Sequence, residues 1–94
     1  MDWQLSVDEL KQCKNQVTLV DVREQEELDT EGFIEGSLHI PLGDLEARAA
    51  ELSKTDDIVI YCAHGVRSLN AAFALKQMGF EKVRSLEGGF ADWS

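Results

Sequence analysis

Apolar residues gather along the chain in short stretches that predict five β-strands. The two clearest are residues 17–22 (VTLVDV) and 58–61 (IVIY), where β-branched and apolar residues follow one another, as in strands covered on both faces. Pro41 has no N–H to donate to a sheet and therefore ends a third, weaker strand. The weaker strands are predicted at residues 3–5, 38–40 and 83–86.

The segment after the first predicted strand begins a helix. Ser6, with Glu9 three residues later, predicts a capping box. The helix that it opens is expected to run to about residue 14. Leu10 and Cys13 would share the inner face of this helix, because residues three or four positions apart lie on one side.

Three further helices are predicted in the rest of the chain. The acidic stretch at residues 24–32 predicts a short helix followed by a loop, and Asp44 is expected to cap a helix over residues 45–52. The alanine-rich residues 68–78 predict the longest helix, which Gly79 closes at the C′ position.

This alternation of strands and helices predicts the fold class. Parallel neighbours in a sheet need crossover connections, so we expect an α/β fold with a mostly parallel central sheet of about five strands and helices on both faces. A chain of 94 residues is expected to form one domain, residues 1–94. Ligands of such folds bind beyond the carboxyl ends of the strands, where Cys62 and Asp21 are predicted to lie.

Composition and charge disfavour several classes of partner. The chain is 44% apolar and 29% charged, as in ordinary soluble proteins, and no apolar run approaches the roughly 20 residues that span a bilayer. Its beginning lacks the segments of a secretory signal, so we expect a cytoplasmic protein without a membrane partner. A net charge of −9, without clustered basic residues, disfavours nucleic acid. An anionic substrate would need a locally positive pocket.

The two cysteines, Cys13 and Cys62, are both expected to be reduced, because nothing else suggests a secreted disulfide scaffold. Neither has a Cys or His neighbour at the spacing of a zinc site, so no metal is expected. Cys13 is expected to pack on the inner face of its helix.

The residues after Cys62 must turn the chain from a buried strand into a helix. Gly65 permits a positive φ in this turn, and such a curled loop points backbone N–H groups towards the sulfur. The helix dipole adds positive potential from the same side, which favours the thiolate and makes Cys62 a nucleophile. The alternative is an inert cysteine that ends a buried strand. Gly65 and Arg67 favour the nucleophile, because an inert cysteine needs neither a nest of N–H groups nor a cation.

Four segments, in order and at consistent spacing, resemble motifs of the rhodanese family of sulfurtransferases. YCAHGVRS (residues 61–68) resembles the family's active-site loop, and LVDVRE (19–24) resembles its first strand motif. GFIEGSLHIP (32–41) resembles its G-H-I-x-G-A-x-x-I-P segment, and LEGGFADW (86–93) its closing G-G-x-x-x-W motif. The likeness covers almost the whole chain.

The resemblance implies roles for individual residues. Cys62 would be the nucleophile, and Arg67 would supply positive charge to an incoming anion. Asp21 and Arg23 would tie the loop edge to the scaffold, with an ordinary salt bridge as the alternative. His64 is interpreted as an exposed imidazole rather than an acid or base. The loop that would cradle the outer sulfur and bind substrate consists of Ala63, His64, Gly65, Val66, Arg67 and Ser68.

The implied activity is that of a thiosulfate sulfurtransferase. Cys62 would take the outer sulfur of thiosulfate or of a persulfide donor, hold it as a persulfide and pass it to a thiophilic acceptor. The acceptor would be cyanide in an assay, and a thiol or a sulfur-acceptor protein in the cell. No metal or organic cofactor is needed, and a monomer is expected.

Two alternatives stay open. A rhodanese-like module that acts as a sulfur carrier or regulator, without turnover, would have the same fold. Phosphatases of the Cdc25 type and related arsenate reductases resemble rhodaneses in fold, but they place five residues between cysteine and arginine. Only residues 63–66 separate Cys62 from Arg67, and this tighter loop suits a single sulfur atom better than a phosphate.

Overall fold

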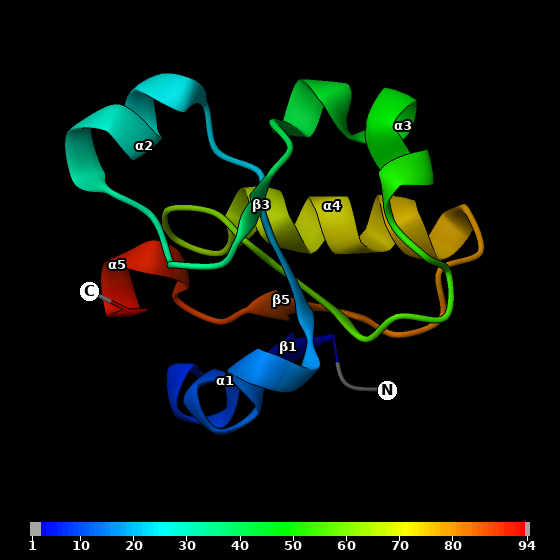
Figure 1. The fold of residues 1–94 in the computed structure, drawn as a ribbon, viewed down its shortest axis with the longest axis horizontal. Helices are drawn as coiled ribbons and strands as arrows, with labels where there is room; N and C mark the ends of the chain where they lie inside the picture. Colours follow the sequence, from blue (N-terminus) through cyan, green and yellow to red (C-terminus); the bar gives the residue numbers. More distant parts are fainter. Residues whose placement is uncertain (1–2, 94) are drawn as a thin grey trace.

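The computed structural model describes residues 3–93, and a five-stranded sheet forms its centre (Figure 1). The strands lie in the order β1-β5-β4-β2-β3, and every neighbouring pair is parallel. The strands are Gln4–Leu5 (β1), Thr18–Asp21 (β2), Leu38–His39 (β3), Ile58–Tyr61 (β4) and Val83–Leu86 (β5). The predicted α/β fold with a parallel sheet of about five strands is therefore confirmed.

Helices cover both faces of this sheet. Figure 1 shows α1 and α5 on one side and α3 and α4 on the other. Short 3₁₀ turns occupy Lys14–Gln16, Leu42–Asp44 and Ala49–Glu51. Within residues 3–93, no helix has the length and apolar character that a bilayer span requires. The helices are Val7–Cys13 (α1), Gln25–Glu31 (α2), Leu45–Arg48 (α3), Val66–Gln77 (α4) and Gly89–Trp93 (α5).

Strand β4 runs through the middle of the molecule and shows why its sequence is apolar throughout. Ile58 and Ile60 belong to the core between the sheet and α4, whereas Val59 and Tyr61 belong to the core on the α1 side. Successive side chains of a strand point to opposite faces, so a strand covered on both faces needs apolar residues at every position. Cys62 continues the α4 side of this alternation.

The first helix begins as its sequence predicts. Ser6 Oγ accepts a hydrogen bond from the Glu9 N–H at 3.1 Å, and the Ser6 N–H donates to Glu9 Oε1 at 2.8 Å. This reciprocal pair satisfies two N–H groups that have no partner inside the helix. The predicted capping box is therefore confirmed.

Helix α4 begins at Val66, two residues before the predicted start at residue 68. Gly65, with a φ of 100°, makes the turn within a single residue, so the helix follows at once. At the other end, the Gly79 N–H donates to the Lys76 carbonyl and the Phe80 N–H to the Leu75 carbonyl, both at 3.1 Å. This is the hydrogen-bond pattern of a glycine C-cap, and it confirms the predicted helix end.

The prediction that Asp44 caps a helix over residues 45–52 is right about the helix start, at Leu45, but wrong about the capping hydrogen bond. Asp44 already has a helical backbone, with φ −101° and ψ −2°, and its side chain makes no capping hydrogen bond. A capping side chain needs an extended backbone, and the 3₁₀ turn that starts after Pro41 removes it. Helix α3 also ends at Arg48 and continues as a 3₁₀ turn.

Candidate active site

Cys62 lies directly after β4, at the carboxyl edge of the sheet, where the chain curls into α4. Its side chain is buried, with 1% of the residue exposed. Asp21 ends the neighbouring strand β2 and is paired in register with Tyr61, the residue before the cysteine. The two strand ends that the sequence singles out therefore lie side by side.

Hydrogen bonds from the loop converge on the Cys62 sulfur. The Gly65 N–H donates to Sγ at 3.1 Å and the Ser68 N–H donates at 3.4 Å. The Ser68 hydroxyl lies 3.4 Å from the same sulfur. Two main-chain amides and one hydroxyl thus surround a sulfur that is almost closed off from water.

These contacts decide the ionisation of the thiol. Burial acts to raise the pKa of Cys62, because a charged sulfur loses its hydration. Hydrogen bonds from the Ser68 hydroxyl and N–H, and from the N–H groups of Gly65 and His64, outweigh burial and hold this pKa below that of an ordinary thiol. The site therefore favours the thiolate, which is the nucleophilic form of cysteine.

The Ser68 hydroxyl is itself hydrogen-bonded to a second hydroxyl, that of Ser85. Ser85, on β5, lies 2.7 Å from Ser68 Oγ, and both serines are fully buried. If Ser85 donates to Ser68, the Ser68 proton is free to point at the Cys62 sulfur. The sequence gives no sign of this role of Ser85, because a serine within a buried strand carries no local mark of its partner.

The start of α5, where Gly88 is followed by Gly89, holds the loop from the other side. The Phe90 N–H donates to the Cys62 carbonyl at 2.8 Å, and the Ala91 N–H donates to the Ala63 carbonyl at 3.0 Å. Gly89 has a φ of 64°, and a Cβ there would lie 2.5 Å from the Cys62 carbonyl oxygen. Only glycine permits this close approach. The approach lets the N–H groups of α5 bind the carbonyls of the sulfur loop.

Arg67 has a partner that lies 40 positions away in the sequence. Its guanidinium binds Glu27, on α2, with two hydrogen bonds of 2.7 and 2.8 Å. The hydrogen bonds from Arg67 are the main reason why the pKa of Glu27 falls to about 2. The acidic stretch contains five neighbouring carboxylates, and the sequence gives no sign of which one pairs with the loop. Contact between Arg67 and a substrate stays a prediction.

Asp21 and Arg23 form a fully buried ion pair beside the loop, with Nη2 and Oδ2 2.9 Å apart. The same carboxylate accepts a hydrogen bond from the Arg23 N–H at 2.9 Å, and Arg23 Nη2 donates to the Gly32 carbonyl at 2.7 Å. The guanidinium also lies over the Phe90 ring, 4.5 Å from its centre. These contacts connect the end of β2 to the loop after α2 and to α5. The geometry fits the predicted supporting role, because both side chains are fully buried and engaged within the protein.

The remaining loop residues lie at the surface. His64 is exposed and lines a hollow together with Glu31, Ala63 and Phe90. Val66 has 71% of its surface exposed. The exposure of the His64 imidazole agrees with the sequence-based interpretation. That His64 takes no part as an acid or base stays a prediction.

Cys13 lies far from this chemistry. It packs against the core on the α1 side of the sheet, whereas Cys62 belongs to the core on the α4 side. Both are free cysteines. Among residues 3–93, no group of three or more His, Cys, Asp or Glu side chains is placed to hold a metal ion.

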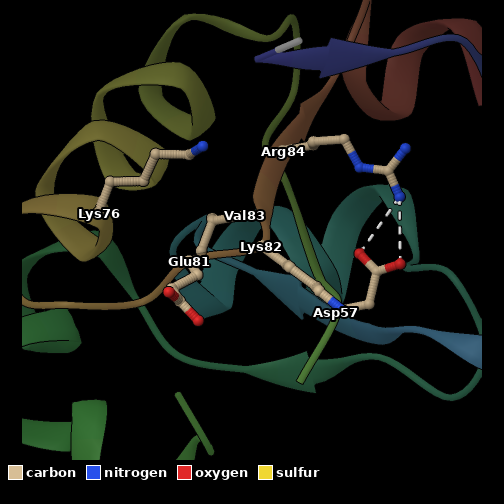
Figure 2. A pocket seen from close by; sticks show the side chains of 6 residues that line it. All are labelled: Asp57, Lys76, Glu81, Lys82, Val83 and Arg84. Atoms are coloured by element: carbon tan, nitrogen blue, oxygen red, sulfur yellow. Dashed lines mark hydrogen bonds and ion pairs between the residues drawn. The ribbon is translucent and has the colours of Figure 1, made fainter. Parts of the chain in front are cut away.

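A charged hollow at the opposite edge of the sheet offers a contrast. Figure 2 shows Asp57 and Arg84 paired there and Lys76 extending from α4. Arg84 Nη2 and Asp57 Oδ1 lie 3.2 Å apart. The hollow lies at the amino ends of β4 and β5, so the whole length of β4 separates it from Cys62. No cysteine or histidine lines it.

In this parallel α/β fold, a buried cysteine at the end of a strand faces a nest of backbone amides. This arrangement is typical of proteins in which a cysteine thiolate reacts with small anionic or sulfur-containing groups. Comparison with known families gives the more particular assignment. Residues 6–94 match the family described as Rhodanese-like domain, and the chain belongs to that family.

Individual relatives support the assignment. The chain is 40% identical over 94 residues to the putative sulfur carrier protein YrkF of Bacillus subtilis, covering 97% of this chain and 50% of that protein. It is 34% identical over 80 residues to the thiosulfate sulfurtransferase GlpE of Coxiella burnetii, covering 85% of this chain and 74% of GlpE. The crystal structure of a rhodanese-related protein from Thermoplasma volcanium superposes with a TM-score of 0.89 at 32% identity, covering 96% and 88% of the two chains.

Proposed function

We propose that this protein is a sulfurtransferase that carries sulfane sulfur on Cys62 as a persulfide. The observation that carries the proposal is the convergence of the Gly65 and Ser68 backbone N–H groups on one buried sulfur, with the Ser68 hydroxyl 3.4 Å from it. A site of this size stabilises a thiolate, and it would also stabilise the negative outer sulfur of a persulfide. The name of GlpE, a thiosulfate sulfurtransferase, supports this chemistry.

The reaction has two half-reactions. In the first, the Cys62 thiolate attacks the outer sulfur of thiosulfate; a new S–S bond forms, the old one breaks, and sulfite leaves with the electron pair. With a hydropersulfide as donor, the leaving group is the donor's thiolate. In the second, an acceptor attacks the outer sulfur and the Cys62 thiolate is regenerated. Cyanide would be the acceptor in an assay, and a thiol or a sulfur-acceptor protein in the cell.

A sulfur carrier is the second candidate. The name of YrkF favours it, and the chain spans half the length of that relative. A carrier would form the same Cys62 persulfide but release sulfur only to a protein partner. The phosphatase alternative has less support, because four residues between Cys62 and Arg67 form a small loop.

Persulfide formation provides the test. Protein incubated with thiosulfate or a hydropersulfide should gain the mass of one sulfur atom, and the Cys62→Ser variant should not. Cys13→Ser is the matched control and should gain the mass as the unmodified protein does. A gain that persists in Cys62→Ser would place the chemistry elsewhere. Thiocyanate formation with cyanide separates the enzyme from the carrier, and a phosphatase assay in parallel tests the third alternative.

A further inference from the structure

The charge that Arg67 brings to the loop is already compensated. Both terminal nitrogens of its guanidinium are bound by the two oxygens of Glu27, at 2.7 and 2.8 Å. The pair is partly exposed, with 36% of the Arg67 side chain and 25% of the Glu27 side chain accessible. A substrate that reaches the sulfur therefore meets an ion pair rather than a free cation.

The other charged groups near the loop do not change this balance. Arg23 is paired with the buried carboxylate of Asp21, and its Nη1 lies 3.6 Å from Glu31 Oε1. Glu31 also lines the hollow that His64 and Phe90 share. The guanidiniums of Arg23 and Arg67 thus lie among the carboxylates of Asp21, Glu27 and Glu31. Helix α2 adds no positive charge, because it contains no Lys or Arg. The backbone amides attract negative charge at the sulfur itself, but the side chains add no net positive potential along the approach.

We infer that Glu27 sets the choice of sulfur donor: by holding Arg67, it makes the Cys62 loop favour a hydropersulfide of low charge over thiosulfate. This inference rests on the proposed sulfurtransferase function. Thiosulfate carries two negative charges and must approach a thiolate, so it depends most on a free cation nearby. A hydropersulfide with an uncharged carbon skeleton carries at most one negative charge and depends on that cation much less.

Both donors react by balanced steps. The Cys62 thiolate displaces sulfite from thiosulfate, or a thiolate from the hydropersulfide, and either reaction leaves one sulfur atom on Cys62. No oxidant or reductant is consumed. The two reactions differ in the charge that must enter the loop, and their rates can be compared in the same protein.

The Glu27→Gln substitution isolates the charge of the pair. Glu27 Oε1 also accepts a hydrogen bond from the Glu24 N–H at 3.0 Å, as part of the capping box of α2. Glutamine can keep that cap, so the helix start is retained while Arg67 becomes an uncompensated cation. Glu26→Gln is the matched control, because this substitution removes the same charge from the same helix. Glu26 is exposed, and it is Glu27 that binds Arg67.

The experiment measures the rate of Cys62 persulfide formation by mass spectrometry, with thiosulfate and with 2-hydroxyethyl hydropersulfide, each below saturation. In the unmodified protein, the hydropersulfide should react faster. Glu27→Gln should raise the ratio of the thiosulfate rate to the hydropersulfide rate by about fivefold or more, the effect of one unit charge at about 4 Å in water. Glu26→Gln should change the ratio by less than about twofold, because its charge is screened. The double variant Glu27→Gln with Arg67→Gln should lose the increase.

Salt dependence gives a test that needs no variant. In the unmodified protein, added NaCl should not slow the reaction with thiosulfate, because no net attraction is present to be screened. A clear decrease with salt would overturn the inference, as would a ratio that is unchanged in Glu27→Gln or equally raised in Glu26→Gln. If neither donor places sulfur on Cys62, the proposed function itself fails, and this result is distinct from a donor ratio that Glu27 does not control.

Discussion

The two edges of the sheet hold polar groups in opposite ways. At the carboxyl edge, Cys62, Ser68 and Ser85 are buried and bind one another within the protein. At the amino edge, Asp57 and Arg84 form a partly exposed pair, with 40% and 28% of their side chains accessible. The hollow at the amino edge is also lined by charged side chains, but they are not directed at a common point (Figure 2). The comparison teaches that converging backbone donors in a dry site, rather than the number of charges, define the candidate active site.

The largest effect is expected when alanine replaces a glycine of positive φ next to the sulfur loop, compared with one far from it. Gly89→Ala would place a Cβ 2.5 Å from the Cys62 carbonyl oxygen, so it should lower the free energy of unfolding by about 3 kcal/mol or more and disrupt the sulfur loop. At Gly79 the nearest atom to such a Cβ is Lys54 Nζ, at 3.5 Å, and only the backbone strain remains. Gly79→Ala should therefore cost about 1–2 kcal/mol.

Urea unfolding and persulfide formation should be measured for both glycine variants. Gly79→Ala should keep its rate of sulfur uptake, because α4 ends far from Cys62. Equal losses of stability and activity in the two variants would contradict the view that Gly89 shapes the loop by close contact.

A smaller effect is expected from removing the Ser68 hydroxyl. Ser68→Ala deletes a hydrogen bond that lowers the pKa of Cys62, so this pKa should rise and less thiolate should be present at neutral pH. The rate of persulfide formation at pH 7 should fall by about tenfold, since a hydrogen bond to a charged group contributes roughly 1.5–3 kcal/mol.

The pH profile checks the sign of this change. The rate rises with pH as the thiol ionises, and its midpoint should move to higher pH in Ser68→Ala. Ser85→Ala, which removes only the supporting hydroxyl, should move the midpoint in the same direction but less far. A rate that falls at all pH values without a shift in midpoint would assign Ser68 a purely structural role.

The smallest effect is expected at the amino edge. Arg84→Gln breaks the exposed pair with Asp57, and such pairs contribute roughly 0–1 kcal/mol. The free energy of unfolding should change by about 0.5 kcal/mol or less, and persulfide formation should be unchanged. A marked loss of sulfur uptake would show that the two edges are coupled and would remove the contrast between them.

Much of the fold could be predicted because its signals are local. The apolar runs of β2 and β4, the Ser6 capping box and the Gly79 helix end each depend on residues that are close in the sequence. The Asp44 cap failed because the chain entered a 3₁₀ turn earlier, and the backbone of Asp44 depends on how that turn packs rather than on its own side chain.

In the candidate site too, the features that could be predicted are those that depend on neighbouring residues. The position of Cys62 after a buried strand and the turn at Gly65 could be derived from the sequence, since strand, turn and helix start are adjacent. The contact of Ser85 with Ser68, 17 positions away, and of Glu27 with Arg67, across 40 positions, follows from the packing of the folded chain. These partners meet because separate elements pack at one edge of the sheet, and no local pattern records which of several serines or carboxylates will arrive there.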